Sequence, residues 1–374
     1  MADKRKRRRR SSALVFLNAL LTLLVIGIIV GGGILYWGVS TFYADGPKAT
    51  DEPFLVEDGS GLSTVGTRLT EQGFLGSGLA TPIIWRAART LLDLKDVSLK
   101  PGQYSIPAHS SMSQIIDILT TTKPQLFAVN VIPGETSFQV AEKVNDPSAS
   151  LMGDPVVPPP EGTLLPVRYD WALPTKQRSD LLADMQKQMA DKVAEIWAGR
   201  DPGVDEFLKT PTDMVTLASL VEKETGLDSE RSHVASVFLN RLKRHMRLQT
   251  DPSVIYGITL GHGKLERSLT TKDLQTKTPY NTYQIDGLPK GPIGNPGVSA
   301  LEAVAHPMQG ADLYFVAKSA DPADGHLFAA TYAQHRKNVA LYRQAVKDQL
   351  AQDAEDAKDA LEAQQASEAG DTSQ

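Results

Sequence analysis

The hydropathy pattern opens with an unbroken apolar run of 25 residues, from Ala13 to Trp37. A helix of this length measures about 37 Å, enough to cross a hydrocarbon core of about 30 Å with some tilt. The run is longer than the apolar region of a cleaved signal peptide, and no A-x-A cleavage site follows it. Tyr36 and Trp37 stand where aromatic residues meet a membrane interface. We predict a single transmembrane helix over residues 13–37.

The flanking charges predict how this helix is oriented. Residues 4–10 read KRKRRRR, and such a cluster stays in the cytoplasm by the positive-inside rule. We therefore read residues 1–12 as a cytoplasmic segment that signals topology and binds anionic lipid, with no nucleic-acid partner. The chain from Phe42 onward is predicted to lie across the membrane from the cytoplasm. In a bacterium, that is outside the cell (inner) membrane, in the periplasm or cell-wall space.

A short polar linker, residues 38–53, is followed by a pattern that recurs three times: alternating apolar residues, a turn, and apolar residues at helical spacing. Each copy predicts a strand, a turn and a helix, and the uneven spacing of the copies argues for small α+β modules over a solenoid. An amphipathic helix is predicted over 81–94. The three copies are Phe54–Leu69, Tyr104–Leu119 and Val129–Val144.

A Pro-rich connector at 154–166 suggests a domain boundary near residue 150, between a region at 54–150 and a larger domain at 151–349. In the larger domain, helical patterns cover 179–198, 212–225 and 229–244. A stretch dense in Gly, Pro, Tyr, Asn and Thr follows at 248–307 and reads as an ordered loop surface. A closing hairpin (313–318 and 326–331), a helix from Tyr332 to about Leu350 and an acidic tail of frayed helix or disorder (350–374) complete an α+β fold.

Composition excludes several kinds of chemistry. The 374 residues include no cysteine, so disulfides, thiolate nucleophiles and Cys-based metal sites are ruled out. The seven histidines do not cluster at ligand spacing, and the nucleotide-binding loops and the serine-hydrolase elbow are missing. We predict no metal and no cofactor. What remains is acid–base work by carboxylates beside polar and aromatic residues, which suits glycosidic bonds.

Two glutamates stand in an otherwise apolar segment: residues 217–226 read LASLVEKETG. A glutamate in an amphipathic helix usually lies on the solvated face. Glu222 and Glu224 are about 200° apart around a helix, so at most one of them can face a given substrate. Both fall on the margins of the apolar arc, and periodicity does not choose between them.

Three stretches resemble the endolytic murein transglycosylases, the MltG (YceG-like) family of membrane-anchored bacterial enzymes. They are LASLVEKETG, residues 230–257 (ERSHVASVFLNRLKRHMRLQTDPSVIYG) and residues 278–307 (TPYNTYQIDGLPKGPIGNPGVSALEAVAHP). The resemblance runs from about residue 54 to 345 and is dense from 217 to 339. It implies a cytoplasmic N-terminus, one membrane helix, a LysM-like region and a C-terminal catalytic domain. One departure is that Val167, Arg168 and Tyr169 follow EGTLLP where the family has Asp-Thr-Tyr.

The resemblance implies a lyase that cuts the MurNAc–GlcNAc β-1,4 bond within nascent peptidoglycan strands and leaves 1,6-anhydro-MurNAc ends. It assigns the catalytic acid to Glu222 and leaves Glu224 a structural role. A lytic transglycosylase uses the substrate's own C6 hydroxyl as nucleophile, so one glutamate can serve first as acid and then as base. An apolar setting would raise the pKa of such an acid.

The loop stretch supplies candidate substrate-binding residues, for which stiff loop structure is the alternative reading. Two other functions stay open: a glycoside hydrolase that uses Glu222 with Asp251, and a non-catalytic peptidoglycan-binding scaffold. The partners we expect are glycan strands, the membrane and peptidoglycan synthases, and the expected role is to terminate glycan elongation. The candidate substrate-binding residues are Gln249, Asp251, Tyr256, Asn281 and Tyr283.

Overall fold

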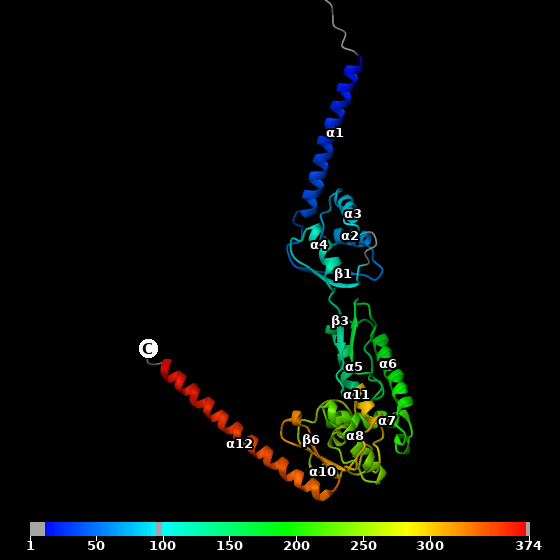
Figure 1. Ribbon diagram of the computed structural model, residues 1–374, viewed down its shortest axis with the longest axis vertical. Coiled ribbons are helices and arrows are strands. Elements are labelled where there is room, and N and C mark those ends of the chain that lie inside the picture. The colour runs from blue at the N-terminus through cyan, green and yellow to red at the C-terminus, as the bar shows by residue number, and fades with distance from the viewer. Residues whose placement is uncertain (1–11, 95–98, 372–374) are drawn as a thin grey trace, which may run out of the picture. The chain divides into compact units, whose positions relative to one another are not determined.

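The structure is a computed structural model that describes residues 12–94 and 99–371 (Figure 1). It is a mixed α+β fold with one long apolar N-terminal helix, as the sequence predicts. The strands of the described residues form three two-stranded sheets, β1–β2, β3–β4 and β5–β6. The chain divides into two compact units: the first extends to Phe127 and includes Trp171–Leu173, and the second holds the remainder. The boundary thus falls earlier than the residue 150 suggested by the sequence.

Helix α1 (Ser12–Tyr43) contains the predicted membrane-spanning run. Its segment Val15–Tyr43 is the one helix of the described residues that is long and apolar enough to cross a membrane. From residue 15 to residue 37 every side chain is exposed. Gly38, Thr41 and Phe42 are partly buried, and they share one face of the last turns. The helix therefore meets the rest of the first unit only through its end.

The first unit is built around two antiparallel strands. Phe54 pairs with Tyr104 in the register of β1 and β2, and both side chains are buried. The capping box of α4, formed by Ser111 and Gln114, explains why the helix starts where the sequence predicts. The elements after α1 are β1 (Glu52–Val56), α2 (Leu62–Glu71), α3 (Thr81–Leu91), β2 (Gly102–Ile106) and α4 (Met112–Thr121).

The segment between α1 and β1 is tied to the first unit by backbone hydrogen bonds. The Gly46 N–H donates to the His109 carbonyl over 3.0 Å, and the His109 N–H donates to the Lys48 carbonyl over 2.7 Å. A Cβ at Gly46 would lie 2.3 Å from the Ser110 carbonyl oxygen, so only glycine permits this close approach. The predicted linker is thus an ordered connection.

The second unit is organised around α7 (Pro211–Glu224), which lies against α6, α8, α9 and α11. Eight consecutive residues of α7, Met214–Val221, are buried, so the helix is the centre of this unit's core. The helices and strands of this unit are β3 (Phe127–Asn130, which starts at the division), α5 (Ser137–Asn145), β4 (Arg168–Trp171), α6 (Arg178–Gly199), α8 (Asp228–Lys243), α9 (Asp251–Thr259), α10 (Thr271–Gln275), α11 (Val298–Ala305), β5 (Tyr314–Ala317), β6 (His326–Ala329) and α12 (Tyr332–Asp371), with short 3-10 turns η1 (Pro147–Ala149), η2 (Val204–Glu206) and η3 (Pro322–Asp324).

Most predicted elements are confirmed, including all three strand–turn–helix copies and the closing hairpin. The third copy, β3 and α5, pairs with β4 and not with the strands of the first two copies. The predicted loop surface at 248–307 contains three short helices, α9, α10 and α11. Helix α12 continues to Asp371, through most of the segment for which the sequence predicts frayed helix or disorder.

Candidate active site

Both glutamates lie in the last turn of α7. The helix starts at a capping box in which Thr210 Oγ1 accepts from the Asp213 N–H and Asp213 accepts from the Thr210 N–H, with Pro211 at the first position. It ends at Glu224, since Thr225 is extended. Carboxylates at a helix C-terminus face the negative end of the helix dipole, so both glutamates need other partners or must hold a proton.

Glu222 is held in an ion pair. Its side chain is 4% exposed, and its Oε1 accepts from Nη2 of Arg231 over 2.7 Å. Its Oε2 accepts from the backbone N–H of Gly297 over 2.9 Å. Arg231 also contacts Asp228 at 2.8 Å. Glu222 therefore joins α7 to α8 and to the start of α11, and its two oxygens are both engaged by protein donors.

Glu224 has a different environment. Its Oε1 accepts a short hydrogen bond from the hydroxyl of Thr250, which precedes α9. Desolvation raises the pKa of Glu224, and the nearby charge of Asp251 raises it further. The Thr250 hydrogen bond and the charges of His326 and Arg241 oppose this without reversing it. Burial thus raises the pKa of the second glutamate of the segment.

Loop residues predicted to bind substrate gather around Glu224. The Thr250 N–H and the Ser253 hydroxyl both bond to the hydroxyl of Thr282, at 2.9 and 2.8 Å, which joins the 249–253 turn to the 281–283 segment. Tyr283 donates its hydroxyl to Asp251 over 2.7 Å. Gln249 is exposed beside them and has a left-handed backbone, with φ of 52°. Gln249, Asp251 and Tyr283 are therefore brought together.

Tyr256 belongs to a second polar group, centred on Glu161. The Tyr256 hydroxyl donates to Glu161 Oε2 over 3.1 Å, and the Ser137 N–H donates to Oε1 over 2.6 Å. Desolvation raises the pKa of Glu161. Desolvation also lowers the pKa of Lys223, although the negative charges of Glu161, Glu135 and Glu222 act to raise it. The lysine between the two α7 glutamates thus connects this group electrostatically to the site.

A surface cavity of about 380 Å³ lies at this group. Its lining includes the side chains of Lys223 and Tyr256, with Gln139 from α5 and Lys264 from the loop after α9. Amide, ammonium and hydroxyl groups beside an aromatic ring can bind the hydroxyl and acetamido groups of a sugar. The cavity opens next to the helix turn that carries Glu222 and Glu224.

Asn281 is buried and acts within the protein. Its amide donates to three carbonyls at the end of α10, those of Asp273, Leu274 and Thr276, at 3.0, 3.2 and 2.7 Å. Its Oδ1 accepts from the Tyr283 N–H over 2.9 Å. These contacts favour stiff loop structure over sugar binding for this residue.

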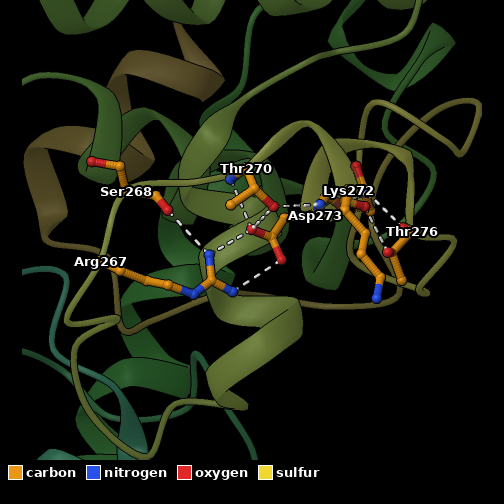
Figure 2. Close-up of polar contacts among 7 residues, drawn as sticks. Arg267, Ser268, Thr270, Lys272, Asp273 and Thr276 are labelled. Carbon is orange, nitrogen blue, oxygen red and sulfur yellow. Dashed lines mark hydrogen bonds and ion pairs between the residues drawn. The ribbon is translucent and has the colours of Figure 1, made fainter.

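The start of α10 is fixed as firmly as its end (Figure 2). Asp273 accepts from Arg267 over 2.6 Å and forms a capping box with Thr270, and these contacts hold the pKa of Asp273 far below its usual range. Arg267 also donates to the Ser268 carbonyl over 3.1 Å. The loop that carries Asn281 and Tyr283 is therefore anchored on a rigid turn of helix.

Three residues outside the predicted site contribute to these groups: Glu161, Arg231 and Thr250. Thr250 stands directly beside the predicted Asp251 in the sequence. Arg231 lies one position after the first residue of the second family stretch. Glu161 contacts Tyr256 across 95 positions of the chain, and only its place in EGTLLP could have indicated it.

Within the described residues, the structure is an α+β protein with one long apolar helix and a cluster of buried carboxylates at the end of α7. The YceG-like family model matches residues 54–341, and the chain belongs to this family, which confirms the resemblance.

Relatives from two species carry the name endolytic murein transglycosylase. The one from Bacillus subtilis (strain 168) is 38% identical over 180 residues, 48% of this chain and 47% of that protein. The one from Streptococcus pneumoniae serotype 2 (strain D39) is 32% identical over 189 residues, 48% of this chain and 32% of that protein. The match thus spans less than half of either relative. A solved YceG-like structure from Listeria monocytogenes covers 77% of this chain and 98% of its own, with 26% identity and a TM-score of 0.48.

Proposed function

We propose that this chain is a membrane-anchored endolytic peptidoglycan transglycosylase, a lyase that cuts the MurNAc–GlcNAc β-1,4 bond and leaves 1,6-anhydro-MurNAc ends. The observation that carries the proposal is the environment of Glu224. This carboxyl has a raised pKa, and the loops of Asp251 and Tyr283 surround it. It also lies in the segment 217–339, where the resemblance to the family is densest. The names of the relatives supply the substrate class.

We assign the acid to Glu224 in place of Glu222. A general acid must hold a proton at the working pH and must present an oxygen to the substrate. Desolvation raises the pKa of Glu224, which favours its protonated form, and among the described residues the Thr250 hydroxyl is its one hydrogen-bond donor, at Oε1. Both oxygens of Glu222 are engaged by Arg231 and Gly297. Glu222 then holds α7, α8 and α11 together.

In the proposed reaction, neutral Glu224 gives its proton to the glycosidic oxygen as the bond from C1 of MurNAc breaks. The resulting carboxylate takes the proton of the C6 hydroxyl, and the C6 oxygen bonds to C1 to close the anhydro ring. The Thr250 hydroxyl stabilises the carboxylate between the two steps. No water enters the product, so one carboxyl suffices.

Asp251 favours one alternative, a glycoside hydrolase. Its charge is close enough to raise the pKa of Glu224, so the two could act as an acid and a second carboxylate. Tyr283, which donates to Asp251, would orient it. A hydrolase adds water and leaves a hydrated reducing end, and the product therefore separates the two reactions.

The test is mass spectrometry of peptidoglycan strands digested by the full chain in detergent, beside Glu224→Gln and Glu222→Gln. We expect anhydro-muropeptides from the wild type and from Glu222→Gln, and a loss of rate of about 10²–10⁴-fold in Glu224→Gln, the usual contribution of a general acid. If only Glu222→Gln lost cleavage activity while staying folded, Glu222 would be the acid, as the sequence predicts. Hydrated ends would indicate the hydrolase, and binding without any cleavage would indicate a scaffold.

We propose further that α1 spans the inner membrane with the N-terminus in the cytoplasm and that both units lie outside. The basic residues 4–10 and the span Val15–Tyr43 support this orientation. The first unit would hold a glycan strand as a LysM-like module, and cleavage near the membrane would terminate growing strands beside peptidoglycan synthases. Glycan strand lengths that stay unchanged when the gene is deleted would refute the termination role.

A further inference from the structure

Helix α3 carries apolar side chains on a buried face and on a neighbouring exposed face. Ile84, Trp85 and Ala88 are buried in the core of the first unit. On the exposed face, Ile83 is 70% exposed and Leu91 is 81% exposed, and Leu79, just before the helix, is 95% exposed. Single exposed apolar residues are ordinary, but several large ones exposed together mark an interaction surface.

The exposed side chains form one continuous face. Ile83, Ala87 and Leu91 are four residues apart, so they lie one above another along the helix. A shallow groove follows the same face, and its lining also includes Pro82, Arg86 and Thr90. We call Leu79, Ile83, Ala87 and Leu91 the α3 stripe.

The position of α3 suggests what covers this stripe. Helix α3 packs against α1, as does α4, and α1 meets the first unit only through its last turns, at Gly38, Thr41 and Phe42. Phe42 packs on the same core cluster as Trp85. The hydrogen bonds of Gly46 and His109 leave little freedom between α1 and this unit. In Figure 1, α3 accordingly lies beside the end of α1.

The end of α1 is also where the membrane surface must be if α1 spans it. Tyr36 and Trp37 mark the interface, and Phe42 lies about 9 Å beyond Tyr36 along the helix axis, at 1.5 Å per residue. The headgroup layer on each side of a bilayer is about 5–8 Å thick. An element that packs against residues 38–42 therefore sits at headgroup level, where interfacial helices bury their apolar faces.

We propose that the α3 stripe docks on the lipid bilayer beside α1, so that the first unit is held on the membrane at two places. The stripe would enter the boundary between headgroups and acyl chains. Arg86, which is exposed and lines the same groove, would contact anionic headgroups. The proposal rests on the proposed membrane anchoring and is independent of the catalytic assignment.

The chain has no cysteine, so a single introduced cysteine can carry an environment-sensitive NBD probe. Full-length Ile83→Cys and Asp58→Cys would be labelled and reconstituted in vesicles of phosphatidylcholine with phosphatidylglycerol. Asp58 is exposed in the turn between β1 and α2 and serves as the matched control. We expect blue-shifted emission at Ile83 and several-fold stronger quenching by spin-labelled lipid there than at Asp58.

A second set of variants tests the stripe itself. With the probe at Ala87→Cys, the substitutions Ile83→Ser and Leu91→Ser should abolish the quenching, while Arg86→Gln should weaken it only in vesicles that contain phosphatidylglycerol. Thermal unfolding checks that each variant is folded, since none of these side chains belongs to the buried core.

Three results would overturn the proposal. A chain that does not float with the vesicles would refute the anchoring itself. A chain that floats but shows equal, weak quenching at Ile83 and Asp58 would refute docking alone. A blue shift that grows with protein concentration in detergent, with energy transfer between labelled copies, would assign the stripe to a second copy of the chain.

Discussion

The guanidinium of Arg231 donates to Glu222 Oε1 over 2.7 Å, and both side chains are nearly buried. This ion pair links the last turn of α7 to α8 across the tight connection at 225–227. A buried pair of this kind is expensive to break, since removing one partner leaves an uncompensated charge. The pair therefore gives Glu222 a structural role in joining α7 to α8.

We predict that Glu222→Gln destabilises the second unit. The variant loses a hydrogen bond between charged groups, which contributes about 1.5–3 kcal/mol, and the remaining contact of Arg231 with Asp228 limits the loss. Denaturant unfolding followed by circular dichroism measures the change. Glu142→Gln, at an exposed position of α5, is the matched control and should change stability by less than about 0.5 kcal/mol. Equal stability of the two variants would contradict the assignment.

Glu224→Gln should stabilise the second unit, by an amount that depends on pH. The pKa of Glu224 is raised above 4.5 by desolvation, so the folded state binds this proton more tightly than the unfolded state does. The stabilising contribution of the neutral carboxyl is complete below pH 4.5 and is lost as the pH rises through the folded-state pKa. Glutamine cannot ionise, and the variant should therefore gain stability relative to the wild type as the pH rises.

Melting temperatures of the two proteins between pH 4 and pH 8 test this. The difference should be smallest at the acid end and should grow toward pH 8. Glu161, whose pKa is also raised, ionises in both proteins and cancels from the comparison. A difference that is constant with pH would mean that Glu224 is not desolvated in the folded protein.

Much of the fold is readable from the sequence because local signals agree with the tertiary structure. The start of α7 follows from Thr210, Pro211 and Asp213, and its body follows from the apolar residues 214–221. Helices α9, α10 and α11 were missed because Gly, Pro and Thr dominate their surroundings. Pro252 in the first turn of α9 and the capping box of Thr270 with Asp273 were nevertheless helix-start signals.

The site was predictable only in part, since its decisive contacts join distant segments. The angle between Glu222 and Glu224 correctly indicates that they have different neighbours. The partner of each depends on the folding of α8, which carries Arg231, and of the turn before α9, which carries Thr250, over the end of α7. Periodicity within one helix carries no information on those neighbours. A resemblance to a motif indicates which residue is functional in the family but not which side chains surround it in the fold.

Asn281→Ala should separate loop structure from substrate binding. The variant loses the hydrogen bonds of the Asn281 amide to three carbonyls at the end of α10 and to the Tyr283 N–H, and we expect a loss of about 1–3 kcal/mol. Asn281→Asp keeps the acceptor but turns an oxygen toward those carbonyls, so it should be at least as unstable. A fully stable Asn281→Ala protein that no longer binds glycan would instead support the direct sugar contact that the sequence predicts.

Tyr256→Phe should make stability more sensitive to alkaline pH. The change removes the hydroxyl that donates to Glu161 Oε2 over 3.1 Å, and this hydrogen bond favours the ionised carboxyl. The pKa of Glu161 should therefore rise further above 4.5, and the cost of the substitution should be larger at pH 8 than at pH 5. Thermal unfolding at the two pH values measures it.

The double variant Tyr256→Phe with Glu161→Gln is the control for this prediction, and the single variant Glu161→Gln completes the set of four proteins. Without an ionisable group at position 161, the cost of removing the Tyr256 hydroxyl should become the same at both pH values. A pH dependence that survives in the double variant would place its origin elsewhere, with Lys223 as the nearest other titrating group of the cavity. Glycan binding measured on the wild type, the two single variants and the double variant would then tell whether the Tyr256 hydroxyl or the Glu161 charge governs binding in the cavity, because Tyr256→Phe keeps the charge and Glu161→Gln keeps the hydroxyl.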